Sequence, residues 1–401
     1  MTLLLLVYRS LRQHALSTLV TAGSIALATG LLLAVWTAKE QSQAAFAATS
    51  TSFDAVLGAR GSKLQLVLNA VFHLEASPGN IAWADYENIR KHPAVKLALP
   101  IAMGDNLRGY RLVGTLASEY QKVEYAPGRT YQIASGGRVF SEGEHEAVVG
   151  SFVARKLNLK VGDTFHPFHG LTFNEHDEHA ETYTVVGILE PTNTPADRVI
   201  WIPLEGVQTM AGHDPRAATE ISAVLIQLRA STAGFLLDQA INRQGNKLTF
   251  AYPVGTIVAE LFQKISWFDR VLGLVAYLVA LVAAASVLAS IYNSMSARRR
   301  DLAILRALGA RQMTIFGAVV AEAAAIGVVG VVAGLVVYGV LISIVATIIR
   351  AQTGVVIETW AWHPVFVVVP LALVALCALG GIVPALKAYR TPVADTLTPT
   401  S

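Results

Sequence analysis

The chain has 401 residues, of which 53% are hydrophobic and 15% charged, with a mean hydropathy of +0.49 and a formal net charge of +3. This composition is too apolar for an ordinary soluble protein. The basic residues lie where membrane topology requires them, so nothing indicates a nucleic-acid partner. The single cysteine, Cys377, excludes an intramolecular disulfide.

Four long windows contain no Asp, Glu, Lys or Arg: residues 13–38, 271–297, 323–349 and 359–386. Each exceeds the roughly 20 residues that carry a helix across about 30 Å of hydrocarbon. The sequence therefore predicts four transmembrane helices that contact membrane lipid, preceded by an interfacial N-terminal helix over residues 1–13. We place the four spans at residues 14–38, 270–297, 313–349 and 363–386.

Basic residues gather at the span ends that we place on one side of the membrane. They are Arg9, Arg12, Arg298, Arg299, Arg300, Arg306, Arg311, Lys387 and Arg390. The positive-inside rule puts these flanks in the cytoplasm, so both termini, the loop 298–312 and the tail 387–401 face inward. Segment 39–269 carries 20 Lys and Arg against 24 Asp and Glu. We place it outside the cytoplasm, together with the short loop 350–362.

The outer segment has the pattern of an α+β domain that follows a helical or irregular stalk at 38–60. Helical spacing appears over residues 80–92 and 152–157, and apolar positions from 254 to 270 predict a helix that continues into span two. Runs rich in Val, Ile, Leu and Tyr predict strands at 96–100, 111–115, 147–149, 182–189 and 223–228. The predicted fold class is membrane α-helical, with four transmembrane helices arranged one plus three and an α+β extracytoplasmic domain inserted between helices one and two.

Spans three and four contain residues that suggest packing and coupling roles. Gly330 and Gly334 form a small-xxx-small pattern that lets helix backbones approach closely. Glu322 is a rare intramembrane acid. It either couples span three to the cytoplasmic loop or pairs near the inner interface. We expect Pro384 to mark the cytoplasmic end of span four.

The cytoplasmic loop carries the most informative motif. It contains Arg298, Arg299, Arg300, Asp301, Leu305, Arg306 and Gly309. With the one-plus-three arrangement of spans, this stretch resembles the cytoplasmic signature of the MacB/FtsX-like permeases of the type VII ABC transporter class. Asp301 stands where glutamate is more usual. The segments 146–164 and 183–189, followed by 200–203, are similar to the MacB-like periplasmic core domain of that family.

The resemblance implies a permease of the bacterial inner membrane that works as a dimer, with an identical or a related second copy. Two copies of a separate cytoplasmic ABC ATPase would bind ATP and Mg²⁺ and push on the 298–311 segment, and the spans would transmit this motion to the outer domain. This chain has no GxxxxGK[ST] phosphate loop, so we expect no ATP hydrolysis and no bound nucleotide here.

A histidine-rich segment at 166–181 is the candidate metal site. Four of the ten histidines fall within fourteen residues, and imidazole with carboxylate suits zinc, copper or nickel. The candidate ligands are His166, His169, His176, Asp177 and His179. A solvated hairpin loop and a contact with a periplasmic binding or adaptor protein are the alternatives. Part of the outer domain also resembles permeases associated with metal or metallophore handling.

Several functions stay open on the sequence alone. The cargo is a metal or metallophore, a lipoprotein, a peptide or a toxic compound, or the chain transports nothing and regulates a periplasmic enzyme as FtsX-like proteins do. A membrane-anchored metalloenzyme using the 166–181 segment is a further alternative. Arg108 and Arg111 are candidates for holding an anionic ligand, but a surface role is the favoured interpretation.

Overall fold

The computed structural model describes residues 3–13, 15–49, 52–213, 215–244, 247–297, 310–353, 356, 359–360 and 362–390. The chain divides into two compact units. We call Met1–Gln41, Ser266–Thr347 and Glu358–Ser401 the helical unit. We call Ser42–Ile265 with Ile348–Ile357 the outer domain.

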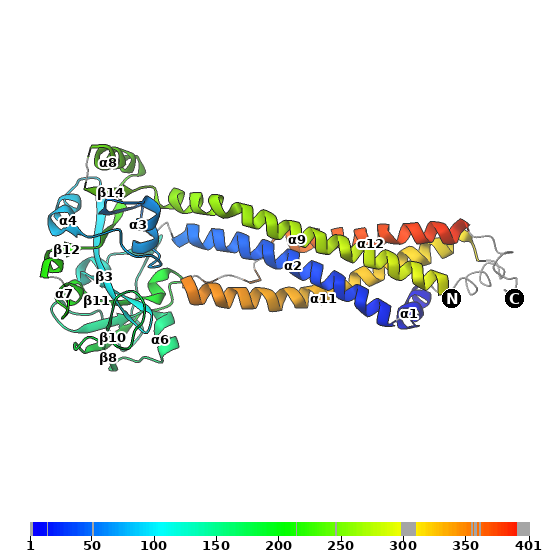
Figure 1. Cartoon of the computed structure of the whole chain (residues 1–401), viewed down its shortest axis with the longest axis horizontal. Helices are drawn as coiled ribbons and strands as arrows, with labels where there is room; N and C mark the ends of the chain where they lie inside the picture. The colour runs from blue at the N-terminus through cyan, green and yellow to red at the C-terminus, as the bar shows by residue number, and fades with distance from the viewer. Residues whose placement is uncertain are drawn as a thin grey trace. The chain divides into compact units, whose positions relative to one another are not determined.

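The helical unit is built from long helices (Figure 1). These helices are α1 (Leu3–Gln13), α2 (Ala15–Thr49), α9 (Val254–Ala297), α11 (Gln312–Thr353) and α12 (Val365–Arg390). Within the described residues, three segments are long and apolar enough to cross a membrane: Ala15–Gln41, Gln312–Gln352 and Val365–Leu386. The remaining predicted span lies in α9, whose apolar stretch is Gly273–Ser286.

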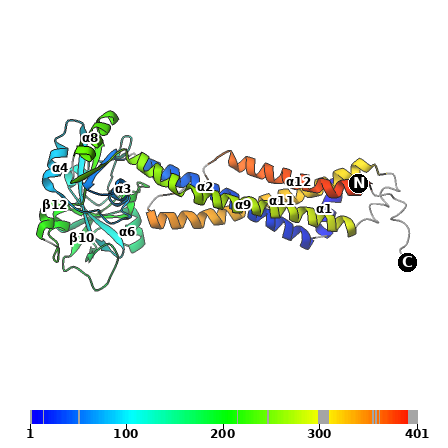
Figure 2. The ribbon, with the colours of Figure 1, turned by 45° about the horizontal axis from the view of Figure 1, so that its top comes forward.

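Small residues bring α2 and α11 into close contact, and the two helices lie side by side in both views (Figures 1 and 2). A Cβ atom added at Gly330 would lie 2.6 Å from the Cβ of Ile25, and one added at Gly334 would lie 2.5 Å from the Cβ of Thr29. Both glycines therefore allow a backbone approach that larger side chains would prevent. Gly327 faces Cys377 of α12 in the same way, at 3.1 Å.

One expectation for span four is wrong. Helix α12 continues through Pro384 to Arg390, with Pro370 and Pro384 both inside it. Proline is tolerated within membrane-spanning helices because neighbouring groups and local adjustments satisfy the carbonyl that it frees. Pro384 therefore does not mark the end of the helix.

The outer domain is organised around one mixed sheet. Among the described residues, ten strands join in the order β14-β1-β13-β3-β4-β11-β7-β10-β8, with β9 paired to β3. The strands of this sheet are β1 (Ala55–Ala59), β3 (Val95–Leu107), β4 (Tyr110–Thr115), β7 (Glu146–Val149), β8 (Thr164–Phe165), β9 (Phe168–His169), β10 (Tyr183–Ile188), β11 (Ile200–Pro203), β13 (Ala223–Leu228) and β14 (Leu248–Ala251). Two small two-stranded sheets are formed by β2 (Ile81–Ala82) with β12 (Glu220–Ile221), and by β5 (Glu124–Ala126) with β6 (Arg129–Thr130).

Helices cover both faces of this sheet, which explains why the interior strand β13 is buried at every position. One face packs against α4 (Trp83–Arg90), α6 (Ser151–Leu157), α7 (Leu204–Gln208) and α8 (Ser231–Gln244). The other face packs against α3 (Lys63–Ala70), α5 (Ala117–Tyr120) and the first turns of α9. Two short 3-10 turns, η1 (Pro195–Arg198) and η2 (Pro215–Thr219), connect these elements.

The predicted strands and helices of the outer domain are confirmed, and the helix from 254 does continue through the second span as α9. The stalk expected at 38–60 is correct only in part, because α2 runs to Thr49 but Ala55–Ala59 forms strand β1 of the sheet. Strand β3 is longer than predicted, because it runs past Pro100 to Leu107. Its pairing with β4 is irregular between Met103 and Asn106. A bulge of this kind re-aims side chains and often lies beside functional sites, and this one contains Asp105.

Candidate metal centre

Four side chains far apart in the sequence meet at the bulge in β3. Asp105, His169, His179 and His213 each offer one ligand atom, and these atoms lie within 4.8 Å of one another. The Asp105 Oδ1 atom is the common point. It lies 3.5 Å from His169 Nδ1 and 3.1 Å from both His179 Nε2 and His213 Nε2. Three imidazoles and one carboxylate form a ligand set that divalent transition metals favour.

The distances agree with a tetrahedral site. Zinc–nitrogen and zinc–carboxylate bonds are about 2.0–2.1 Å long, which puts neighbouring ligand atoms of a tetrahedron about 3.3 Å apart. The three separations from Asp105 Oδ1, 3.1, 3.1 and 3.5 Å, bracket this value. The histidine nitrogens would have to draw somewhat closer to one another around an ion, because the widest separation in the group is 4.8 Å.

Backbone pairing places Asp105 and His169 opposite each other. Strand β9 pairs antiparallel with the end of β3 in the register Asp105↔His169. The Asn106 side chain fixes this arrangement, since its Nδ2 donates to the carbonyls of Phe168, Gly170 and Thr172 at 2.9–3.3 Å. Its Oδ1 accepts a hydrogen bond from Gly109 N at 2.9 Å.

The histidine-rich segment is a hairpin whose two arms bring His169 and His179 together. His169 N donates to Asp177 O at 2.7 Å, and His179 N donates to Pro167 O at 2.8 Å. Phe168 forms a bridge with Glu178 between these two bonds. Side chains alternate between the faces of an extended arm, so His169 and His179 share one face of the hairpin and lie diagonally across it.

His213 is oriented by the helix that precedes it. Its Nδ1 lies 2.7 Å from Val207 O in the last turn of α7, where carbonyls lack partners within the helix. A carbonyl only accepts hydrogen bonds, so Nδ1 carries a proton. Metal-binding histidines typically donate their second ring nitrogen to such an acceptor. Nε2, which faces Asp105, is therefore the nitrogen available to bind an ion.

The electrostatics of the cluster favour a positive charge at its centre. The Asp105 side chain is fully buried, and its Oδ2 has no hydrogen-bond partner among the described residues. Burial of a carboxylate is costly unless a cation compensates it. The hydrogen bond from His213 to Asp105 raises the pKa of the imidazole, against the opposing effect of burial. A metal ion would replace the His213 proton as the compensating charge.

One side of the cluster is open to solvent. The His169 side chain is 54% exposed, whereas those of His179 and His213 are 6% and 10% exposed. A cavity of about 330 Å³ adjoins the site and is lined by Gly104, His169, Val207 and His213 among others. An ion can therefore reach the cluster without unfolding of the domain.

The structure brings together two of the five residues proposed from the sequence, His169 and His179. The other three lie elsewhere. His166 Nδ1 lies 3.2 Å from Glu181 O, the Asp177 carboxylate accepts from Asn174 Nδ2 at 2.7 Å, and His176 is exposed in the hairpin turn. The His-x-x-His spacing suggested two adjacent pairs, but three positions along an extended arm place the rings on opposite faces.

The sequence patterns did not indicate Asp105 and His213 as metal ligands. A weak signal for Asp105 exists, because it is an acid within the otherwise largely apolar run 101–107. The chain gives no comparable signal for His213, which is 108 residues from Asp105. A hydrogen bond from Ala211 N to Glu181 Oε1, 2.8 Å long, links its loop to the base of the hairpin.

The residues proposed to contact the ATPase lie outside the described part of the chain. They are Arg298, Arg299, Arg300, Asp301, Leu305, Arg306 and Gly309. In the helical unit, Glu322 accepts a hydrogen bond from the buried Ser10 hydroxyl of α1. This contact places Glu322 against the N-terminal helix.

Comparison with known proteins matches both halves of this architecture. The MacB-like periplasmic core domain model matches residues 15–243, more than half of the chain, and the FtsX-like permease C-terminal model matches residues 273–393. Similar solved structures include the extracellular domain of the noncanonic ABC-type transporter YknZ from Gram-positive bacteria, with 16% identity, a TM-score of 0.30 and coverage of 49% of this chain and 97% of that chain. The periplasmic region of MacB from Actinobacillus actinomycetemcomitans is 10% identical, with a TM-score of 0.34 and coverage of 54% and 95%, respectively.

These family matches agree with the predicted fold class, a set of membrane helices with an inserted α+β outer domain. The family is one of bacterial membrane permeases rather than of enzymes, and its members work with a cytoplasmic ABC ATPase. This chain therefore belongs to the MacB/FtsX-like permease family of type VII ABC transporters.

Proposed function

We propose that this chain is a mechanically driven permease subunit whose outer domain binds a transition-metal ion, with Zn²⁺ as the best-suited ion. Asp105, His169, His179 and His213 would hold the ion. The single observation that carries this proposal is the convergence of their four ligand atoms within 4.8 Å around a fully buried carboxylate.

The ligand chemistry favours zinc over the alkaline-earth ions. Ca²⁺ and Mg²⁺ select six or more oxygen ligands, whereas this group offers three nitrogens and one oxygen. Cu²⁺ and Ni²⁺ also bind imidazole but prefer square-planar or tetragonal arrangements. Four N/O ligands converging on one point suit the tetrahedral preference of Zn²⁺.

The exposed ligand supports a role for the ion in cargo handling rather than in holding the fold together. His169 lies beside the cavity of about 330 Å³ and is more than half exposed. An ion bound there can exchange with solvent or with a metal complex. A periplasmic metal or metallophore is therefore the cargo that this outer domain fits best.

A continuous helix supports mechanical transmission between this domain and the ATPase. The first turns of α9 contribute Val254, Ile257 and Val258 to the outer-domain core. The same helix runs without interruption to Ala297, immediately before the proposed ATPase contact at Arg298–Arg300. Two ATPase copies would push on this contact in a permease dimer of the inner membrane. The motion would then be transmitted along α9 to the outer domain.

The test is the metal content of the purified full-length chain after incubation with zinc and removal of unbound metal. We expect about one zinc per chain for the wild type and for His166→Gln and His176→Gln. We expect its loss in His179→Gln and His213→Gln, because each removes one ligand. Equal zinc content in all four variants would refute the site.

A further inference from the structure

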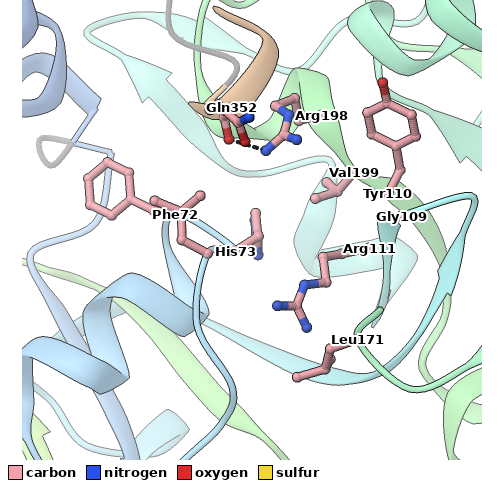
Figure 3. A pocket seen from close by; sticks show the side chains of 10 residues that line it. Phe72, His73, Gly109, Tyr110, Arg111, Leu171, Arg198, Val199 and Gln352 are labelled. Carbon is pink, nitrogen blue, oxygen red and sulfur yellow. Dashed lines mark hydrogen bonds between the residues drawn. The ribbon is translucent and has the colours of Figure 1, made fainter. Parts of the chain in front are cut away.

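A second pocket of the outer domain gathers positive charge that makes no ion pair with a carboxylate of the described residues. This cavity (Figure 3) has a volume of about 180 Å³, and none of the four metal-cluster residues lines it. His73, Tyr110, Arg111, Leu171, Arg198 and Gln352 are among its lining residues. They come from the turn after α3, from β4, from the histidine-rich hairpin, from the end of η1 and from the last turn of α11.

Arg198 is held in place but keeps an unused donor. Its guanidinium carbon lies 5.7 Å from the centre of the Tyr110 ring, a distance typical of a cation–π contact. One of its terminal nitrogens donates to the carbonyl of Gln352, as the dashed line in Figure 3 shows. Its Nε is buried and has no hydrogen-bond partner among the described residues.

Arg111 approaches the same cavity from β4, and one of its terminal nitrogens is also buried without a partner in the described chain. No described carboxylate lies within ion-pair distance of Arg111 or Arg198. Burial lowers the pKa of Arg111, Glu75 opposes this effect, and the neighbouring charge of Arg198 lowers the pKa further. Both arginines therefore bring positive charge to one pocket, and neither has an ion-pair partner among the described residues.

His73 lies between the two arginines in Figure 3. It is buried, and burial together with the charges of Arg111 and Arg198 lowers its pKa to about 3. The ring is therefore neutral at physiological pH. Its Nδ1 is buried and has no partner among the described residues. In the tautomer that carries the proton on Nδ1, the neutral ring can donate a hydrogen bond to an oxyanion.

We propose that this pocket binds a small oxyanion, a carboxylate or a phosphate, between Arg111 and Arg198. An anion would compensate the positive charge of the two arginines and accept hydrogen bonds from their unpaired donors. Guanidinium groups suit carboxylate and phosphate oxygens because their planar donors match the geometry of these anions. The cavity is smaller than the roughly 300–1,000 Å³ typical of drug-sized ligands, so the ligand is a small molecule.

The test measures the thermal unfolding midpoint of the full-length chain in detergent, with inorganic phosphate or succinate added and chloride used to match the ionic strength. For the wild type we expect a rise of about 3 °C or more with at least one probe. A shift with phosphate alone would identify a phosphoryl ligand, and a shift with succinate alone would identify a carboxylate.

Variants connect this shift to the pocket. Arg111→Met should abolish it and should lower the midpoint without anion little, because the substitution removes a half-buried cation that has no ion-pair partner among the described residues. Arg111→Lys keeps the charge but loses the fork of donors, and should weaken binding about tenfold. Arg155→Met, which alters an exposed arginine of α6, should leave the shift intact. The proposal is overturned if neither probe shifts the wild type, or if Arg111→Met and the wild type shift equally.

Discussion

The Oδ1 atom of Asp105 lies 3.1 Å from Nε2 of His213, which is 108 residues later in the chain. The other ring nitrogen of His213 donates to the Val207 carbonyl. Both ring nitrogens therefore face oxygen atoms, an arrangement that favours the doubly protonated, positively charged ring when no metal is bound. Replacing the proton on Nε2 by a metal ion keeps the compensating charge beside the carboxylate.

This relationship predicts a strong effect of Asp105→Asn on zinc affinity. The amide keeps the size of the side chain but removes the charge and most of the ligand strength. Loss of a ligand should weaken binding more than the 10–100-fold that outer-shell changes produce, so we expect a decrease of about 100-fold or more. Competition against a chromophoric chelator measures it. Asp177→Asn in the hairpin turn is the matched control and should bind zinc like the wild type.

Zinc should also stabilise the folded chain by mass action. At a free zinc concentration 100 times the dissociation constant, binding adds about 2.7 kcal/mol to the free energy of unfolding. A chelator should reverse this increase, and His179→Gln should not show it. Thermal unfolding with and without zinc provides the measurement. An equal zinc effect in His179→Gln would indicate binding elsewhere.

Close helix packing predicts a cost for larger side chains at Gly330 and Gly334. Each glycine contacts α2 so closely that an added Cβ would lie 2.5–2.6 Å from Thr29 or Ile25. Gly330→Leu and Gly334→Leu should each destabilise the helical unit by about 1–3 kcal/mol through overpacking. Thermal unfolding in detergent should show a lower midpoint for both.

Gly23 of α2 offers the matched control for this packing, because a Cβ atom there meets nothing within 4 Å in the described structure. Gly23→Leu should leave the unfolding midpoint close to that of the wild type. If Gly330→Leu behaved like Gly23→Leu, the contact between α2 and α11 would not contribute to stability.

Arg298, Arg299 and Arg300 form the proposed ATPase contact. Replacing all three by alanine should therefore uncouple ATP hydrolysis by the partner ATPase from the permease. Membrane insertion should be normal, because Arg306 and Arg311 still mark the cytoplasmic side. Co-purification of the ATPase and its stimulation by the permease should fall at least several-fold. The double variant Lys387→Ala and Arg390→Ala removes charge from the same side and should behave like the wild type. Full stimulation in the triple variant would place the contact elsewhere.

The sequence predicted those parts of the fold that depend on local periodicity and composition. Uncharged windows such as 323–349 identify membrane helices because hydrocarbon excludes charge over the whole length of a span. The strand at 223–228 was recognisable because both faces of it are buried. The continuation of α12 through Pro384 was not predictable in this way, since neighbouring groups decide whether a proline ends a membrane helix.

Only two of the four residues of the metal cluster could be predicted from the sequence, because the cluster forms through tertiary contacts between distant segments. His169 and His179 lie in one hairpin, and the high density of histidines in this segment indicated a candidate metal site. Asp105 reaches the cluster through a bulge in β3, and His213 reaches it through the turn after α7. No spacing rule joins these three segments. They meet because β9 pairs with β3 and because Glu181 holds the loop of His213.

X-ray absorption at the zinc edge of the purified full-length chain tests the central claim most directly. We expect about one zinc per chain with four nitrogen or oxygen neighbours at about 2.0–2.1 Å, including the scattering signature of three imidazole rings. Asp105→Asn should lose this spectrum, whereas His166→Gln should keep it. A chain that retains no stoichiometric zinc, or whose zinc shows fewer than two imidazoles, would contradict the account.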